Sequence, residues 1–284
     1  MLNYVSKSFK FVQTSRRFFA TGADHAAPSS LVTQYRYVPV GDHPIFPGST
    51  ATVSLTQSEY DLLKETETVF ASIVKNDAIL KTNSNDLMGQ LQKQVLRMPD
   101  VGLPKIKSEA DIYTVGTICQ AKAIQDPQNP FSPYMLNLFP LRKAHLSSFV
   151  DPIGPLARVI VDEIRHNDEL EEKDLNSDEL VIFKFIKQQY LKCFKIAPDE
   201  KFLAYLQYLE RSFDTRKVNE FVNMLLTCVS LPQYINTYQF LVKARKHELQ
   251  KVFESNEVFD KLQGASDIFT DFVNKIEIWQ KLEQ

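Results

Sequence analysis

The period of the hydrophobic pattern changes once along this chain, and that change constrains the fold more than any other feature. Up to about residue 162, short apolar runs are separated by Pro, Gly, Asn and Asp, which is typical of strands and turns. In one run, Ala51, Val53 and Leu55 alternate with polar residues, as in a strand that buries one face. Beyond Ser177 the apolar residues recur every three or four positions, as on a helix. The sequence therefore predicts an α+β fold.

The front half contains several candidate strands and one well-marked helix. Thr56 and Glu59 have the spacing of a capping box, in which each side chain satisfies a backbone amide at the helix start. A helix is therefore expected over residues 58–65. Residues 81–110 are polar and predict a loop, with one helical turn at Leu87, Leu91 and Val95. Strands are expected at residues 51–55, 69–74, 112–124, 134–139 and 157–162.

The back half is expected to be all helical. Ser177, followed by Asp178 and Glu179, suits the start of a helix, because acids there complement the helix dipole. An acidic linker over residues 167–178 is expected to join the two halves. Two apolar stripes must pack against other elements: Val218, Phe221, Val222, Leu225 and Val229; and Val258, Leu262, Ala265, Phe269, Phe272, Ile276 and Trp279.

The first thirty residues differ from the rest of the chain. They contain four basic residues and one acid, with several Ser and Thr. On a helix, Val5, Phe9 and Val12 would share a face that lies away from most of the basic side chains, which is typical of a mitochondrial presequence. A membrane-surface helix and a disordered basic tail are the alternatives.

The end of this segment predicts a processing site. Arg17-Phe18-Phe19-Ala20 resembles a site cleaved in the mitochondrial matrix, with Arg three residues before the cut and an aromatic residue directly before it. We therefore expect cleavage between Phe19 and Ala20, and a matrix location. The expected domains are the presequence at residues 1–30, a β-rich subdomain at 31–166 and a helical bundle at 167–284.

Charge and hydropathy narrow the range of partners. Removal of residues 1–30 takes away 4 of 33 basic and 1 of 35 acidic residues, which leaves 29 and 34 and a net charge of −5. Without a basic patch, nucleic acid is not expected as a partner. The basic run at 243–246 lies in a helical pattern and is expected to form a solvated face. The longest uncharged apolar run, near 221–231, is far shorter than the ~20 residues that span a bilayer, so no membrane span is expected.

The reactive residue types form no recognisable catalytic or metal site. Cys119, Cys193 and Cys228 are odd in number and lack C-x-x-C spacing, so we expect buried free thiols and neither disulfides nor a zinc ribbon. No phosphate-binding loop, G-x-S-x-G or H-E-x-x-H motif occurs. Glu163 and His166 have the spacing of a di-iron motif, but such a site needs further carboxylates. We predict no enzyme activity, no catalytic residue and no cofactor.

Three motifs, in order along the chain, resemble the N-terminal domain of Lon proteases. The first is a strand followed by Phe46-Pro47-Gly48. The second, at residues 112–117, ends in Val115-Gly116-Thr117. The third, at residues 247–254, includes Glu248-Leu249-Gln250. Together they cover most of residues 35–282. A fourth family segment is represented only by Arg142, without its usual acid and glycine.

The resemblance implies a β-rich pseudo-barrel followed by a helical subdomain that recognises unfolded or damaged proteins. Lon proteases continue into ATPase and protease domains, and this chain ends at Gln284, where those would begin. The expected function is therefore a non-catalytic protein-binding module of the mitochondrial matrix, either a recognition adaptor or a subunit of a larger assembly. The alternative is the substrate-recognition part of an ATP-dependent protease whose other domains are missing. Self-association is left open, and no partner-binding residue is predicted.

Overall fold

The computed structural model describes residues 33–41, 43–75, 102–128, 133–164, 169–197, 200–230 and 246–283. Thr33–Gln284 forms one compact unit. The presequence with its site at Phe19 and Ala20, and the helical turn at Leu87, Leu91 and Val95, lie outside the described residues. The subdomain boundary at 166/167 stays a prediction.

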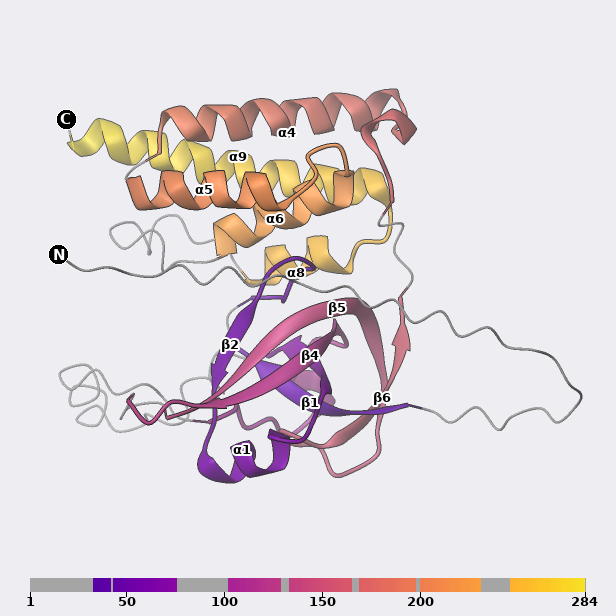
Figure 1. Ribbon diagram of the computed structural model, residues 1–284. Coiled ribbons are helices and arrows are strands. Elements are labelled where there is room, and N and C mark those ends of the chain that lie inside the picture. Colours follow the sequence, from indigo (N-terminus) through magenta and orange to yellow (C-terminus); the bar gives the residue numbers. More distant parts are fainter. Residues whose placement is uncertain are drawn as a thin grey trace, which may run out of the picture. The chain divides into compact units, whose positions relative to one another are not determined.

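Five strands of the front half form a closed ring. The hydrogen-bonded order is β2-β5-β4-β3-β1-β6, and β6 also pairs with β5, so β1, β3, β4, β5 and β6 close on themselves while β2 extends the edge of β5. Figure 1 shows these strands curving around a common interior. The predicted α+β class with a β-rich barrel is confirmed. The strands are β1 (Gln34–Val40), β2 (Ala51–Ser54), β3 (Thr68–Ile73), β4 (Val115–Gln125), β5 (Tyr134–Phe149) and β6 (Arg158–Glu163).

The helix between β2 and β3 begins where the capping box predicts. In α1 (Gln57–Leu63), the Glu59 amide donates to Thr56 Oγ1 over 3.3 Å, and the Thr56 amide donates to Glu59 Oε2 over 2.7 Å. Glu59 also accepts a hydrogen bond from the Leu103 amide at 3.1 Å. The capping carboxylate therefore fixes both the start of α1 and the backbone at residue 103.

The expected strand at residues 134–139 was too short. Pro140 has no amide hydrogen to donate to a neighbouring strand, which makes it an ordinary end of a strand. Here β5 continues to Phe149, because the pairing register with β4 shifts between Ile118 and Cys119, opposite Arg142 and Pro140. This bulge accommodates the proline within the strand. The expected strand at 112–124 began too early, since Ile112 forms only an isolated bridge with Val74.

The back half is helical, as predicted. Its helices are α4 (Ser177–Lys195), α5 (Glu200–Ser212), α6 (Val218–Ser230), α8 (Lys246–Glu254) and α9 (Val258–Glu283). The N-cap of α4 is Asn176, whose side chain accepts from the amides of Asp178 and Glu179. The described part of the expected linker folds onto the bundle, because Leu170 is buried and its carbonyl accepts from the Val218 amide.

Helix α6 lies at the centre of this half. Twelve of its thirteen residues are buried, all but Glu220, and they include the polar Asn219, Asn223, Thr227 and Ser230. The predicted stripe on α6, and that on α9 as far as Ile276, contribute to one apolar core, which also takes in Phe183 and Phe202 from α4 and α5. The side chain of Trp279, the last residue of the α9 stripe, lies outside the described residues. The three cysteines are buried free thiols, as predicted. In the described part of the chain, no helix is both long and apolar enough to cross a membrane.

Candidate protein-binding surface

The residues of the first motif form a tight turn after β1. The Ser49 amide donates to the Phe46 carbonyl over 3.0 Å, and Gly48 has a φ of +84°. Pro followed by a residue with positive φ is the pattern of a type II turn, which favours glycine at the second position. A Cβ at Gly48 would also lie 2.3 Å from Phe213 Cε1. The turn therefore needs glycine for its conformation and for its contact with the end of α5.

Phe46 leaves the barrel and enters the helical core. Its side chain is 1% exposed and belongs to the apolar cluster of the bundle. Its ring lies edge-to-face on Phe253 of α8, with centroids 5.6 Å apart. Such pairs add to the stabilisation that burial itself provides. The first motif thus places an aromatic anchor from the barrel in the bundle.

The second motif lies directly beside this turn. Thr117 is buried, and its Oγ1 donates to the Ile45 carbonyl over 2.9 Å, one residue before Phe46. A Cβ at Gly116 would lie 2.3 Å from the Ala71 carbonyl oxygen, so glycine allows β4 and β3 to approach closely. The Val115 carbonyl accepts a hydrogen bond of 2.9 Å from Gln250 Nε2.

The third motif provides the helical side of the same contact. Gln250 is 1% exposed, and besides Val115 its amide nitrogen also reaches Glu254 Oε1. Leu249 is buried in the bundle core, whereas Glu248 is exposed. Helix α8 therefore presents polar and apolar side chains that match the backbone and the turn of the barrel.

Lys143 is the residue of this contact that the sequence did not reveal. Its side chain is 2% exposed, and Nζ donates to the Glu254 carbonyl (3.0 Å), the Ser255 carbonyl (3.3 Å) and Asn256 Oδ1 (3.1 Å). It also lies over the Phe253 ring at 5.5 Å. An ammonium at the carboxyl end of α8 satisfies carbonyls that have no helical partner. Burial lowers the pKa of Lys143 to about 8, which the Glu254 charge partly opposes.

Arg142, the residue that the sequence singled out, points elsewhere. Its Nη1 lies 2.7 Å from Glu163 Oε2, in an ion pair on the surface between β5 and β6. The two neighbours differ because successive side chains of a strand point to opposite faces. No signal in the sequence marked Lys143, because the expected strand ended at residue 139, before β5 reaches this position.

Two further contacts link the barrel to the start of α8. The Tyr113 hydroxyl hydrogen-bonds His247 Nδ1, and Lys75 lies 5.0 Å over the Tyr113 ring. Lys246 Nζ donates to the Val74 carbonyl over 2.9 Å. The expectation of a wholly solvated basic run at 243–246 is therefore wrong for Lys246, while the rest of that run lies outside the described residues.

We call this set of contacts the barrel–bundle junction, and all three motifs meet there. Its motif residues are Phe46, Pro47, Gly48, Val115, Gly116, Thr117, Leu249 and Gln250, and it also contains Lys143, Tyr113 and Phe253. Because these side chains are mostly buried and bonded to each other, the motifs specify how the two halves pack. They do not form a surface that a partner could contact.

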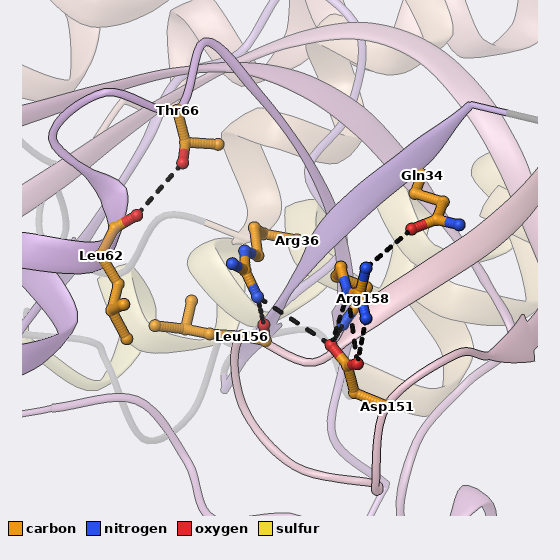
Figure 2. A network of polar contacts seen from close by, with 7 residues as sticks. All are labelled: Gln34, Arg36, Leu62, Thr66, Asp151, Leu156 and Arg158. Carbon is orange, nitrogen blue, oxygen red and sulfur yellow. Dashed lines mark hydrogen bonds and ion pairs between the residues drawn. The ribbon is translucent and has the colours of Figure 1, made fainter.

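A second polar network closes the barrel where β6 meets β1 (Figure 2). Asp151 accepts from Arg158 Nη2 at 2.8 Å and from the Arg158 amide at 2.9 Å, and these hydrogen bonds lower the pKa of Asp151 to about 2. Arg36 Nη1 donates to the carbonyl of Leu156, which has a φ of +64°. Each charge has a partner within the network, so we interpret it as structural.

The described helices expose apolar side chains beside a groove between α4 and α9. The groove has a volume of about 580 Å³. Val181 is 67% exposed and Phe185 40% exposed, and together with Ile182 they form its α4 side. The α9 side is polar: Gln263, Ser266, Asp267, Thr270, Asp271 and Asn274. We call this feature the α4–α9 groove.

Comparison with solved structures finds Lon N-terminal domains. The N-terminal domain of Mycobacterium avium complex Lon protease is 12% identical, with a TM-score of 0.48, and the match covers 84% of this chain and 99% of that one. A Lon N-terminal domain protein from Xanthomonas campestris is 10% identical, with a TM-score of 0.43 and coverage of 82% and 96%. Both belong to the family that the three motifs resemble. No protein-family model and no curated protein matches the chain.

The described residues bring no reactive groups together. No cluster of three or more His, Cys, Asp or Glu side chains that could hold a metal ion occurs within the described ranges. His166, the partner of Glu163 in the di-iron spacing, lies outside them. Burial raises the pKa of Cys119 and of Cys193 to about 12, so neither thiol is an available nucleophile at neutral pH.

Proposed function

We propose that this chain is a non-catalytic protein-binding module of the mitochondrial matrix, acting as a recognition adaptor or as a subunit of a larger assembly. The observation that carries the proposal is the apolar wall formed by Val181 and Phe185 beside the α4–α9 groove. The motif resemblance to Lon N-terminal domains supports the same class of function. The motif residues themselves serve the barrel–bundle junction, which leaves recognition to other parts of the surface.

The physical basis is the exposure of large apolar side chains next to a concave surface. Covering a Val or Phe side chain that is otherwise exposed contributes about 1.5–3 kcal/mol. Two such side chains, after the cost of immobilising a partner, correspond to weak and reversible binding. Weak binding to apolar segments suits a module that samples proteins for exposed apolar sequence.

The matrix location rests on the sequence of residues 1–30. Import of the full chain into isolated mitochondria tests it. We expect a protease-protected product that has lost 19 residues and begins at Ala20. An unprocessed chain that stays accessible to added protease would refute the location and leave the binding proposal untouched.

The binding proposal is tested with the purified full chain. The ligand is a reduced, carboxymethylated protein that cannot fold, and the same protein in its native form is the control. We expect saturable binding of the unfolded form only, without ATP hydrolysis or peptide cleavage. Equal binding of both forms, or binding of neither, would contradict the proposal. Co-purification with an ATPase–protease from mitochondria would instead favour the recognition part of a Lon-type protease.

A further inference from the structure

We propose that the α4–α9 groove binds a basic amphipathic helix of a partner protein, with the partner's apolar face on α4 and its basic face toward α9. This inference deepens the proposed function, on which it rests, by naming the site and the chemistry of its ligand. It depends on the division of the groove into two chemically different walls, on its charge and on its length.

The two walls differ because each helix turns a different face to the groove. Val181, Ile182 and Phe185 occupy neighbouring positions on α4 and form an apolar strip. Opposite them, the residues of α9 offer hydroxyl, amide and carboxylate groups. A ligand that covered both walls with apolar groups would bury the polar groups of α9 without partners, which is costly. An amphipathic ligand can match both walls at once.

The charge of the groove selects a basic ligand. Its lining contains two carboxylates, Asp267 and Asp271, and within the described residues no Lys or Arg belongs to it. Asp267 accepts from Gln263 Nε2 at 2.9 Å, and Asp271 lies 2.5 Å from Lys275 Nζ. Gln263 is neutral and leaves the negative charge of Asp267, whereas Lys275 offsets the charge of Asp271; both carboxylates keep acceptor capacity for a ligand. A basic face would therefore be attracted and an acidic one repelled.

The shape of the groove suits a helix. Figure 1 shows α4 and α9 side by side, and the ion pair of 2.8 Å between Lys192 and Glu277 links them beyond the groove. The lining on α9 runs from Gln263 to Asn274, three helical turns or about 17 Å at 1.5 Å per residue. Two packed helices present ridges and a furrow into which the side chains of a third can fit. A partner helix of about 12 residues would fill this length.

The test uses the full chain and a fluorescent synthetic peptide of 18 residues that carries Leu on one helical face and Lys on the other. Fluorescence anisotropy measures its affinity for the chain. Val181→Asp has a matched control in Leu191→Asp, on the same helix, 59% exposed and outside the groove lining. Asp267→Asn is matched by Asp260→Asn, exposed on α9 and also outside the lining.

We expect Val181→Asp to weaken the affinity about tenfold or more, because it loses apolar contact and buries a charge. Asp267→Asn should weaken it about threefold, an effect that disappears at 0.5 M salt. Both control variants should bind normally, and a peptide with Glu in place of Lys should not bind. Circular dichroism verifies that every variant is folded.

Failure of the peptide to bind would overturn the inference, and so would three other results. One is equal weakening by Val181→Asp and Leu191→Asp, and another is equal affinity for the Lys and Glu peptides. The third is a dimer of the chain that Val181→Asp dissociates, since a second copy would then occupy the groove. If the unfolded protein still binds while the peptide does not, only this inference fails. If neither binds, the proposed function fails as well.

Discussion

The barrel–bundle junction and the α4–α9 groove both involve the helical half, but the side chains of the junction are buried and the apolar side chains of the groove are exposed. At the junction, Phe46 is 1% exposed and Lys143 is 2% exposed with three acceptors for its ammonium. At the groove, Val181 is 67% exposed and Phe185 40% exposed. The junction is complete within the chain, whereas the groove leaves apolar surface uncovered.

This difference in exposure separates the residues that specify the fold from those that are available to bind a partner. Every motif of the Lon resemblance, except the one represented by Arg142, falls at or beside the junction, and none falls in the groove. A motif of this kind therefore identifies the architecture without locating the partner. The comparison makes a quantitative claim: junction substitutions should cost stability, and groove substitutions should cost binding only.

The largest loss of stability is expected for Phe46→Ala. The change leaves a cavity in the helical core and removes the edge-to-face contact with Phe253. Deletion of a fully buried Phe side chain costs about 3–5 kcal/mol. Chemical denaturation of the full chain measures this directly. A loss below about 1 kcal/mol would mean that the junction does not couple the halves.

Lys143→Met should cost less, about 1–3 kcal/mol, because it leaves the carbonyls of Glu254 and Ser255 without a donor. Met keeps most of the volume, so the loss reports the hydrogen bonds. Leu141→Met, at an exposed position of the same strand, is the control. Equal stability of the Lys143 and Leu141 variants would contradict the role of Lys143 as a cap of α8.

The same lysine predicts how stability changes with pH. Its pKa is about 8 in the folded chain and 10.5 ordinarily. Below pH 8 the lysine is charged in both states, and the full cost of burying the charge is present. Between pH 8 and 10.5 the unfolded state holds more protons, so stability rises with pH. The wild-type chain should gain stability over Lys143→Met from pH 7 to 9.5. A flat difference would show that the pKa is not lowered.

Gly48→Ala should cost about 2 kcal/mol. One part of this loss in the free energy of unfolding comes from the strain of a side chain at a φ of +84°. The other part comes from the close contact of the new Cβ with Phe213. A double-mutant cycle separates the two, because Phe213→Ala removes only the contact. In that background Gly48→Ala should cost about 1 kcal/mol. Complete rescue would mean that the backbone conformation carries no strain.

The sequence predicted the strands, the capped helix α1 and the helical half, because each depends on local periodicity or capping. The barrel was expected only from the resemblance to Lon N-terminal domains. It missed the length of β5, since whether a strand can continue past Pro140 depends on a bulge formed with β4. It missed Lys143 for a related reason. A single lysine in a strand reveals neither its face nor the helix end that it will meet.

The groove could not be predicted at all. Its walls come from α4 and α9, whose lining residues lie about 80 positions apart in the sequence. Val181 and Phe185 on α4 are as apolar as the buried Phe183. Only the packing of the helices decides which of them remains exposed.

Arg142→Ala is expected to lower stability only slightly, because Arg142 is a motif residue that lies outside the junction. The ion pair with Glu163 joins side chains that are 59% and 42% exposed. Exposed pairs of this kind contribute less than about 1 kcal/mol, and salt reduces the contribution further. Denaturation at low and at high salt should therefore show a loss well below that of Lys143→Met. A larger loss would place Arg142 among the residues that specify the fold.

The smallest change in stability is expected at the groove, and it tests the other side of the comparison. Val181→Asp replaces a side chain that is 67% exposed in the second turn of α4. The free energy of unfolding should therefore stay within about 0.5 kcal/mol of wild type. If the variant instead unfolds as readily as Phe46→Ala, then Val181 supports the bundle and the two regions do not differ in kind. If it keeps its stability and loses affinity for unfolded protein, the exposed wall of α4 is maintained for binding and contributes nothing to the fold.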